Sequence, residues 1–584
     1  MKILINHIGY EQHAPKKALL ACQGKTAGAG FALVPADGGA AVFHGAAVEC
    51  GEVARWHTGY YYLFDFTAYC GEGIYILRCD TPEGPVLSQP FEIRHNLLGH
   101  RTLSDAGYYF KAQRLSGEWL EADRHITFMG SRAGVLDVHG GWYDASGDPG
   151  IHMSHLSHST YFNPQQHPLS AYVFFKAFDL LEATGNGLYN QILRRYLDEG
   201  YVGADFIMRM RTGNGTFFKA VQRLDSYASV RVSRKLVFEY DHSSRQFGAA
   251  ATAGQETISD RNYETSLRCG GGLCIAALAA AGRHYYPSAG YSQSEYILAA
   301  KDSYACLEAN NETYTNDGQW NLVDEYCALA ALTELYLATR ENTYRLKGRE
   351  MARRILKRFV QAGEGGYFSV DGTGRPFFHA SDAGLPVMAL LGFLDIARDE
   401  ALSADILRVC GQAMAYQLAV TKEVNNPFGY ARQLVRTGGR NKTAFFFPHD
   451  TEAAPWWQGE NARLASLAAA AYRMAAVTAD AEKREALLRF AADQLDWILG
   501  LNPFDSCMMK GHGRNHIEYY SLDRYEFMAC PGGIVNGITG GIDDDEGICY
   551  HREPDEAVKD NWRWAEQWIP HVSWYIWAVA LAAV

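Results

Sequence analysis

Two aspartates in a glycine-rich segment are the residues of this chain whose spacing first suggests chemistry. The segment VHGGWYDASGDPGIHMSH spans residues 138–155, and an Ala-Ser-Gly spacer separates Asp144 from Asp148. Small residues let the backbone turn tightly, so both carboxylates can face one point. Two carboxylates directed at one water molecule can orient it and accept its proton. An Asx-turn or part of a calcium loop would have a similar composition, and these structural alternatives carry about equal weight.

A second candidate is the aromatic and acidic segment HDTEAAPWWQGEN at 449–461. Trp faces can stack on the apolar face of a pyranose, and carboxylates accept hydrogen bonds from hydroxyl or ammonium groups. A buried aromatic corner is the alternative, with Glu460 in the first turn of a helix, where it complements the helix dipole. The candidate substrate contacts in this segment are His449, Asp450, Glu452, Trp456 and Trp457.

The N-terminal stretch predicts β structure. Residues 1 to about 97 hold short apolar or aromatic runs, such as GYYYLFDF and GIYILRC, separated by Gly, Pro, Asn and Asp. Strands at this spacing with turn residues between them are typical of a small antiparallel sandwich. We therefore expect a β-sandwich domain at 1–97 and a second domain at 98–584.

From about residue 102 the apolar residues follow a helical period. LVDEYCALAALTELYLAT and ARLASLAAAAYRMAAV are apolar over most of their surface, which predicts inner helices. NTYRLKGREMARRILKRFV is amphipathic, with Leu346, Met351, Ile355 and Phe359 expected on one face. Twelve helices of such alternating character favour an (α/α)6 toroid, six inner and six outer, over an irregular α-solenoid. The candidate helices begin near Asp105, Ser170, Leu188, Asn262, Ser294, Leu322, Asn342, Ser381, Ala401, Gly459, Asp480 and Ile569.

Four long connections, 121–169, 212–260, 422–458 and 502–566, have no helical period. Loops of this length are uncommon unless they are functional or disordered. Three of them are rich in aromatic, His, Gly and acidic residues, which disfavours disorder. The sequence therefore indicates a rigid helical scaffold carrying a site built from loops.

Charge and composition exclude several classes of partner. The formal net charge is −12, and no run of Lys or Arg could form a nucleic-acid patch. Polar Asn6 and His7 interrupt the N-terminus before a signal-peptide core, and no apolar stretch is long enough to span a bilayer. The twelve cysteines form no CxxC pair or Cys/His cluster, and those in apolar helical patterns, such as Cys274 and Cys327, should be buried. We expect a reduced, cytoplasmic protein with no membrane association and no cofactor.

The glycine-rich segment also carries a family resemblance. GGWYDASGD resembles the GGWYDAGD signature of glycoside hydrolase family 9, the cellulase family with an (α/α)6 barrel. INHIGY resembles the immunoglobulin-like module that often precedes that barrel. VDEYCALAALTELYLAT at 323–339, ILGLNPFDSCMMKGHG at 498–513 and an acid near the C-terminus match further, so the resemblance covers nearly the whole chain. It implies inverting hydrolysis of β-glycosidic bonds in an oligosaccharide.

The resemblance implies roles for three carboxylates. Asp148 matches the family's general base, Asp144 its companion in holding the water, and Glu566 the general acid. Inversion needs one ionised and one protonated carboxylate on opposite faces of the sugar, roughly 6.5–9.5 Å apart. Three Trp residues near Glu566 in sequence could supply the apolar surroundings that raise its pKa. Glu546, within DDDEG, is a rival acid that ranks below Glu566.

The resemblance extends to substrate contacts, whereas charged residues elsewhere have structural interpretations. Trp142 and Tyr143 of the signature are included as substrate-binding candidates. Arg514 or His516 of KGHGRNH stands where the family keeps a loop lining the cleft, with surface basicity as the alternative. DDDE at 543–546 could bind Ca²⁺, although solvated charge is expected. Four further acids begin helices and are expected to complement helix dipoles: Asp324, Glu325, Asp382 and Glu264.

Two departures from the family pattern point to a branch of it. Three residues separate the aspartates instead of two, and Glu566 lies in WAEQWIPHVSWYIWAVALA instead of an NEVAIDYN-like context. With SHLSHSTYFNPQQHP at 154–168, these features resemble a small branch associated with exo-acting enzymes on short oligosaccharides, including exo-β-D-glucosaminidases. An ammonium group at C2 would need an unpaired carboxylate beside it, for which Asp450 and Glu452 are candidates.

Several functions therefore stay open. Exo-β-D-glucosaminidase activity on chitosan oligosaccharides is the first hypothesis, and a cellulase-like endoglucanase or a cellodextrinase or β-glucosidase acting on β-glucans is the alternative within the class. A glycoside phosphorylase is an alternative of another class, against which the second aspartate argues. A non-catalytic sugar-binding protein is a further alternative, against which the three retained carboxylates argue.

Overall fold

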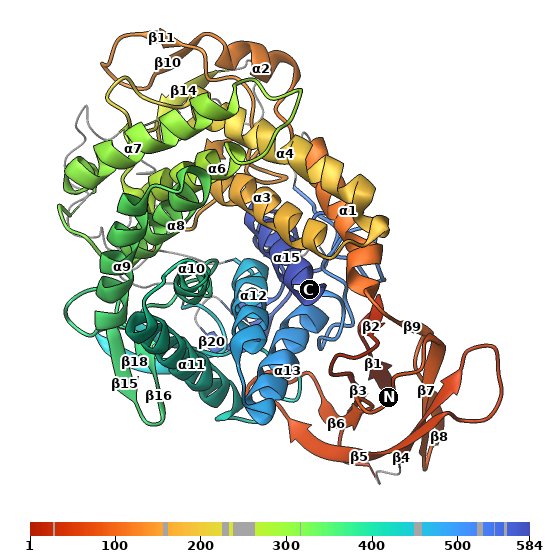
Figure 1. The fold of residues 1–584 in the computed structure, drawn as a ribbon. Helices are drawn as coiled ribbons and strands as arrows, with labels where there is room; N and C mark the ends of the chain where they lie inside the picture. The colour runs from red at the N-terminus through yellow and green to blue at the C-terminus, as the bar shows by residue number, and fades with distance from the viewer. Residues whose placement is uncertain are drawn as a thin grey trace.

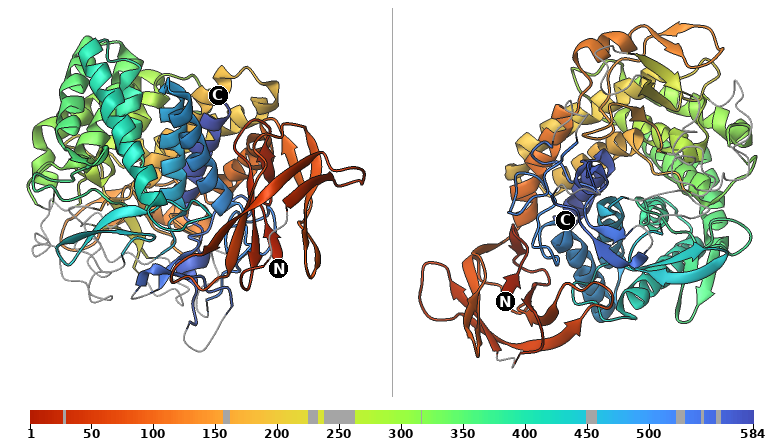
Figure 2. Two further views of the ribbon diagram at one scale, coloured as in Figure 1. Left: turned by 90° about the horizontal axis from the view of Figure 1, so that it is seen from below. Right: turned by 180° about the vertical axis from the view of Figure 1, so that it is seen from behind.

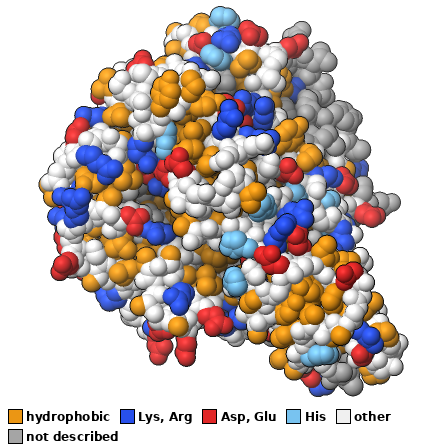
Figure 3. Space-filling view, turned by 45° about the vertical axis from the view of Figure 1, so that its right-hand side comes forward, with side chains coloured by type: hydrophobic (Ala, Val, Ile, Leu, Met, Phe, Trp, Pro, Cys, Tyr) orange, Lys and Arg blue, Asp and Glu red, His pale blue; other side chains and the backbone are white. Residues whose placement is uncertain are grey.

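The computed structural model describes residues 1–584 except 27–29, 156–161, 225–232, 238–262, 316, 449–457, 522–528, 542–543 and 554–557. A β-rich N-terminal part lies beside a ring of helices (Figure 1). No helix among the residues described has both the length and the apolar character needed to cross a bilayer. On the face that Figure 3 presents, acidic and basic side chains are interspersed.

Nine strands form the N-terminal part, in the order β1-β3-β6-β5-β4-β7-β9-β2, with β8 on β7. The first half of β5 pairs with β4 and the second half with β6, so this one strand links two sheets. Alternate side chains point inward, and Phe31 stacks on Phe64 with ring centroids 4.6 Å apart. The predicted immunoglobulin-like sandwich is confirmed. The strands are β1 Lys2–Leu4, β2 Gly9–Glu11, β3 Lys17–Cys22, β4 Gly30–Pro35, β5 Phe43–Glu52, β6 Tyr60–Asp65, β7 Gly73–Thr81, β8 Gly84–Leu87 and β9 Phe91–Arg94.

Twelve helices of ten or more residues, counted over the described part of the chain, form the ring. Six inner helices contact one another in the sequence α3, α6, α8, α10, α12 and α15, and α15 contacts α3 and closes the ring. The outer helices α4, α7, α9, α11, α13 and α1 pack mainly on these inner helices, in the same order. This closure confirms the (α/α)6 toroid and excludes an open solenoid. The helices are α1 Leu97–Ala112, α3 His167–Ala183, α4 Asn190–Arg209, α6 Gly272–Ala281, α7 Gln293–Tyr314, α8 Leu322–Thr339, α9 Asn342–Lys357, α10 Leu385–Leu394, α11 Glu400–Lys422, α12 Asn461–Val477, α13 Ala481–Ile498 and α15 Ile569–Ala582.

The apolar patterns of the helices predict their layers correctly, with two errors in detail. α8 and α12 are buried on nearly all sides, as expected of inner helices, and amphipathic α9 is an outer one. Leu346 was expected on the buried face of α9, but its side chain is 46% exposed. The buried face instead includes Tyr344 and Gly348, because Phe393 of α10 occupies the space where a side chain at position 348 would lie. Phe359 lies beyond the end of α9, in strand β15.

The long connections carry short elements and gather at the N-terminal ends of the inner helices (Figure 2). One five-stranded sheet, in the order β11-β10-β14-β13-β12, stands next to the glycine-rich segment. The remaining connections form two-stranded sheets. The further elements are α2 Gly117–Asp123, β10 Ile126–Phe128, β11 Val135–Leu136, β12 Ile151–His152, β13 Ala220–Arg223, β14 Arg234–Val237, β15 Phe359–Ala362, β16 Gly365–Phe368, β17 Gln433–Thr437, β18 Arg440–Ala444, β19 Thr539–Gly541, β20 Asp544–Cys549 and α14 Trp562–Ala565.

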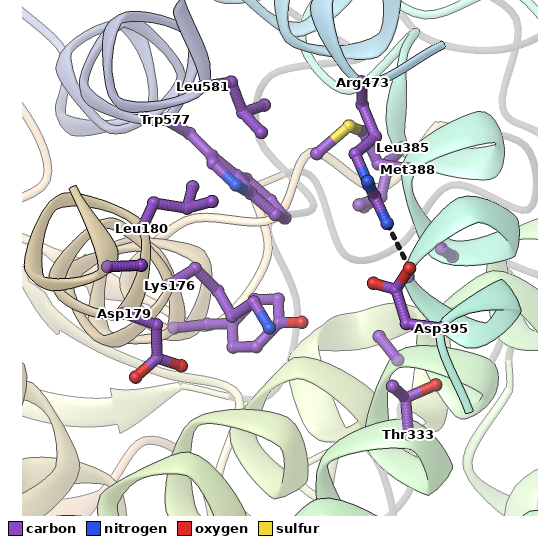
Figure 4. A pocket seen from close by; sticks show the side chains of 15 residues that line it. Lys176, Asp179, Leu180, Thr333, Leu385, Met388, Asp395, Arg473, Trp577 and Leu581 are labelled. Carbon is purple, nitrogen blue, oxygen red and sulfur yellow. Dashed lines mark hydrogen bonds and ion pairs between the residues drawn. The ribbon is translucent and has the colours of Figure 1, made fainter. Parts of the chain in front are cut away.

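A cavity of about 280 Å³ opens inside the ring away from these loops. It is lined by residues of α3, α8, α10, α12 and α15, and Figure 4 shows Trp577 on one side and the Arg473–Asp395 ion pair on the other. Lys176 is neutralised by Glu334 at 2.9 Å. The charges along this wall are thus paired within the protein.

Polar contacts join the sandwich to the ring. The Asn6 amide donates to Asp496 Oδ1 at 2.7 Å, and burial raises the pKa of Asp496 to about 7. His7 Nε2 lies 2.9 Å from Asp505 Oδ1, and Arg514 Nη2 donates to the same oxygen at 2.7 Å. The polar pair that interrupts the apolar N-terminus is therefore part of the interface between the two parts of the chain.

Candidate active site

The loop that carries Asp144 and Asp148 pairs directly with the segment that carries Glu566. Ser146 N donates to Gln567 O at 2.8 Å, and Gln567 N donates back to Ser146 Oγ at 2.8 Å across 421 positions of sequence. Ala145 forms a β-bridge with Trp568. These bonds lie at the start of α15, one of the inner helices, so the acids stand at the loop-bearing end of the ring.

This close approach requires a glycine at position 147 of the spacer. A Cβ atom added to Gly147 would lie 2.6 Å from Glu566 Oε1 and 2.3 Å from the Tyr519 hydroxyl. A Cβ atom at Gly150 would lie 2.9 Å from Asp148 Oδ1. The Glu566 carboxylate therefore lies over the backbone between the two aspartates.

Gly147→Ala should lower kcat/KM about 10²-fold, because the added methyl group displaces Glu566 and misplacing a reacting group by about an ångström has such an effect. Steady-state kinetics measure the loss, and circular dichroism verifies the fold. Gly392→Ala in α10 is the matched control, since a Cβ there meets nothing within 4 Å. That control should retain activity and gain about 0.5–1 kcal/mol of stability. Equal activity of the two variants would contradict the geometry.

Asp144 is a buried carboxylate, 3% exposed, with partners on both oxygens. Its Oδ1 accepts hydrogen bonds from Gln166 Nε2 and, at 3.3 Å, from Trp568 Nε1. Its Oδ2 lies 3.3 Å from His152 Nδ1. Burial raises the pKa of Asp144, although His152 and Gln166 oppose the rise. Burial also opposes the charge on His152, yet the facing carboxylate raises the pKa of that imidazole.

Asp148 is half-buried and forms the Asx-turn that its sequence context allowed. Gly150 N donates to Asp148 Oδ1 at 2.7 Å, and the backbones of Asp148 and Ala145 exchange hydrogen bonds of 3.2 Å. Arg234 Nη1 donates to the Pro149 carbonyl at 2.7 Å and fixes the far side of the loop. The turn holds the carboxylate through one of its oxygens, which is compatible with a role in orienting water.

Glu566 is 6% exposed and connects α14 to α15. Its backbone N–H donates to Trp562 O at 3.0 Å, and its carbonyl accepts from Asn536 N at 2.7 Å. Trp564 and Trp568 on either side of it are almost fully buried. Both of these sequence neighbours of Glu566 are therefore buried, and their effect on its carboxylate stays a prediction.

Four further residues of the site escaped the sequence reasoning. Gln166 and His152 contact Asp144, and the Tyr519 hydroxyl lies beside Gly147. His155 packs against Trp568, with ring centroids 6.1 Å apart. The histidines of HMSH were visible as a signal, whereas Tyr519 lies in an aromatic loop with no motif of its own.

The structure corrects the expectation for Trp142. Its side chain is 0% exposed and surrounded by Phe110, Phe174 and His167, and its indole N–H donates to Glu199 at 3.0 Å. A fully enclosed ring cannot stack on a sugar, so Trp142 supports the loop from within the core. Tyr143 is mostly buried and packs edge-on against Trp119, so it lies in the wall of the loop.

The other predicted contacts divide into two groups. The Arg514 guanidinium contacts Asp505 at the interface with the sandwich, and His516 Nδ1 lies 3.0 Å from the Cys507 carbonyl. These contacts are structural, and sugar binding by either residue stays a prediction. The remaining five candidates lie outside the described residues: His449, Asp450, Glu452, Trp456 and Trp457.

Most of the other acids have structural partners. Glu546, the rival acid, pairs with Arg432 at 2.9 Å in strand β20. Its neighbours Asp544 and Asp545 pair with Arg55 and Lys442, so the described acids of this run are ion-paired and not merely solvated. Glu460 pairs with Arg463, Glu325 with Arg358, and Glu264 with Arg132. Asp324 completes a capping box at the start of α8, and Asp382, whose pKa burial raises to about 6, accepts from Trp574 Nε1 at 2.9 Å.

His571→Asn should weaken the dependence of the free energy of unfolding on pH, because one titrating group is removed. His571 Nδ1 accepts a hydrogen bond from Ala462 N at 2.7 Å, and burial lowers its pKa to about 3. In the unfolded chain His571 takes up a proton as pH falls below about 6.5, whereas in the folded protein its side chain stays neutral until about pH 3. The free energy of unfolding therefore falls as pH falls between these two values. The contribution is about 1.4 kcal/mol per pH unit, and an asparagine oxygen can accept the same bond without titrating. Urea unfolding at a series of pH values measures it; parallel curves for wild type and variant would refute the assignment.

The loops thus bring Asp144, Asp148 and Glu566 to the same end of a closed (α/α)6 ring. The family model described as Glycosyl hydrolase family 9 matches residues 100–523, and the model of the cellulase N-terminal Ig-like domain matches residues 1–83. The chain therefore belongs to glycoside hydrolase family 9. The matched range includes Asp144 and Asp148 and ends before Glu566.

Solved structures agree on the fold. A metagenome-derived family 9 endoglucanase superposes with a TM-score of 0.67 at 18% identity, covering 100% of this chain and 99% of that one. A family 9 protein of Bacteroides ovatus gives 0.66 at 18% identity, covering 100% and 98%. A cellodextrinase of Butyrivibrio fibrisolvens is 28% identical over 235 residues, which is 38% of this chain and 40% of that protein. The match thus spans less than half of that relative.

Proposed function

We propose that this protein hydrolyses a β-glycosidic bond of an oligosaccharide with inversion of configuration. Asp148 removes a proton from the attacking water, Asp144 helps to hold that water, and Glu566 protonates the leaving oxygen. The observation that carries the proposal is the pairing of Ser146 with Gln567, which joins the loop of the two aspartates to the segment of the glutamate.

We further propose release of glucosamine from the non-reducing end of chitosan oligosaccharides. Support comes from the three-residue spacer, from the sequence around Glu566 and from the segment at 154–168, all of which resemble the branch that contains exo-β-D-glucosaminidases. Cello-oligosaccharides are the second candidate substrate, favoured by the partial likeness to a cellodextrinase. Hydrolysis with inversion is common to both proposals, and only the sugar differs.

Product anomers followed by NMR test the proposal on a panel of chitosan, cello- and mixed-linkage oligosaccharides. An inverting enzyme forms the α-anomer first from a β-linked substrate, and chitosan oligosaccharides should be cleaved fastest, one residue at a time. A first product of β configuration would refute the mechanism. A rate that requires phosphate would identify a phosphorylase, and no turnover on any substrate would favour a sugar-binding protein.

A further inference from the structure

Two histidines to which the proposed hydrolysis assigns no role lie close to the Asp144 carboxylate. Ligand atoms of Asp144, His152 and His155 all lie within 4.8 Å of one another, and Asp144 Oδ2 and His152 Nδ1 are 3.3 Å apart. In a tetrahedral site with ligand bonds of about 2.0–2.2 Å, neighbouring ligand atoms are about 3.4 Å apart. The three groups therefore need to close by only about an ångström, which half-buried His155 can supply by rotation of its side chain.

The backbone holds these three groups in register. His152 ends strand β12 and pairs with Ala220 of β13. His155 N donates to the Pro164 carbonyl at 3.0 Å, and Ser154 forms a bridge with Gln165. The segment with both histidines is thus fixed to the residues that lead into α3, whose first turn follows Gln166.

The carboxylate is already oriented as a metal ligand needs to be. Gln166 Nε2 and Trp568 Nε1 both donate to Asp144 Oδ1, which leaves Oδ2 directed at His152. Hydrogen bonds of this kind to the outer oxygen or nitrogen orient the ligands of natural metal sites. Two imidazoles and one carboxylate favour a borderline metal such as Zn²⁺ over Ca²⁺ or Mg²⁺, which prefer oxygen ligands.

We propose that Asp144, His152 and His155 bind one Zn²⁺ ion, and that the bound ion inhibits hydrolysis. The proposal that Zn²⁺ binds rests on the geometry of these three side chains and not on the proposed function. Inhibition rests on the proposed function, because an ion on Oδ2 removes Asp144 from the attacking water and its positive charge disfavours proton uptake by Asp148. Zn²⁺ is thus a reversible switch on the site and not a cofactor.

Binding is tested on the full chain after chelation and dialysis, with Zn²⁺ in calorimetry and Co²⁺ in visible spectroscopy. One equivalent of metal should bind. The Co²⁺ spectrum should lack the thiolate charge-transfer bands that would appear if any of the twelve free cysteines were a ligand. His155→Ala and the milder His155→Gln should each weaken the affinity at least tenfold, since even an outer partner of a ligand has an effect of about 10–100-fold. The matched control is His125→Ala, an exposed histidine, which should bind like wild type.

Absence of stoichiometric binding, or equal affinity in the His155 variants, would overturn the site while leaving the proposed hydrolysis untouched.

Activity is then measured with and without Zn²⁺. Wild type should lose most of its rate and recover it with chelator, whereas the His155 variants should need at least tenfold more Zn²⁺ for the same fractional loss. A rate that rises with Zn²⁺ would overturn inhibition. If no substrate is turned over at all, the proposed function fails and the binding measurement still decides the site.

Discussion

Asp148→Asn should lower kcat by about 10²–10⁴-fold, the range that a positioned acid or base contributes. The neutral asparagine amide is too weakly basic to accept the proton of the attacking water, as the carboxylate does. Its oxygen can still accept the bond that Gly150 N now donates to Asp148 Oδ1, so the turn should be retained. We therefore expect the dissociation constant for oligosaccharide, measured by calorimetry, to change little while turnover is almost lost.

Asp137→Asn is the matched control for this substitution. Asp137 lies on the same connection, half exposed and paired with His139, so its amide should leave kcat within about twofold. The loss at position 148 should persist on an activated substrate such as a β-glycosyl fluoride, since water must still be deprotonated. Substantial activity of Asp148→Asn on any substrate would show that another group is the base.

Glu566→Gln should lower kcat on natural oligosaccharides by a similar factor for a different reason. A glutamine side chain occupies the same space over Gly147 but donates no proton to the leaving oxygen. The expected signature is selective: a β-glycosyl fluoride, whose leaving group departs as an anion, should retain much more of its wild-type rate than an oligosaccharide does. Rates on the two substrates, compared in one variant, measure this difference.

Glu546→Gln is the control that separates the two candidate acids. Glu546, in β20, forms an ion pair with Arg432. The glutamine variant should therefore lower thermal stability slightly and leave both rates near wild type. The reverse outcome, with turnover lost in Glu546→Gln and kept in Glu566→Gln, would transfer the acid role to Glu546 and refute the site.

Local patterns predicted the architecture because burial periodicity is set residue by residue. α8 and α12 are apolar all round in sequence and are inner helices in the ring, and alternating strands with turn residues form the sandwich. The spacer between Asp144 and Asp148 predicted a tight turn, because only small residues allow it, and the turn is present. These are properties of neighbours along the chain.

The direction of a side chain depends on segments far away in sequence, and here the patterns were insufficient. Trp142 stands in the family signature yet is enclosed by Phe110 and His167, which come from two different helices. Arg514 lies at the interface with the sandwich, because its guanidinium donates to Asp505, which also contacts His7 of the sandwich.

The sequence by itself determined which acids the chain carries, the two kinds of periodicity and the turn that presents Asp148. Only the tertiary structure decided that Ser146 meets Gln567, that Gly147 lies under Glu566, and that the histidines of HMSH face Asp144. The physical reason is that these contacts form when the ring closes on itself through α15 and α3, and a contact made by closure leaves no local pattern in either partner.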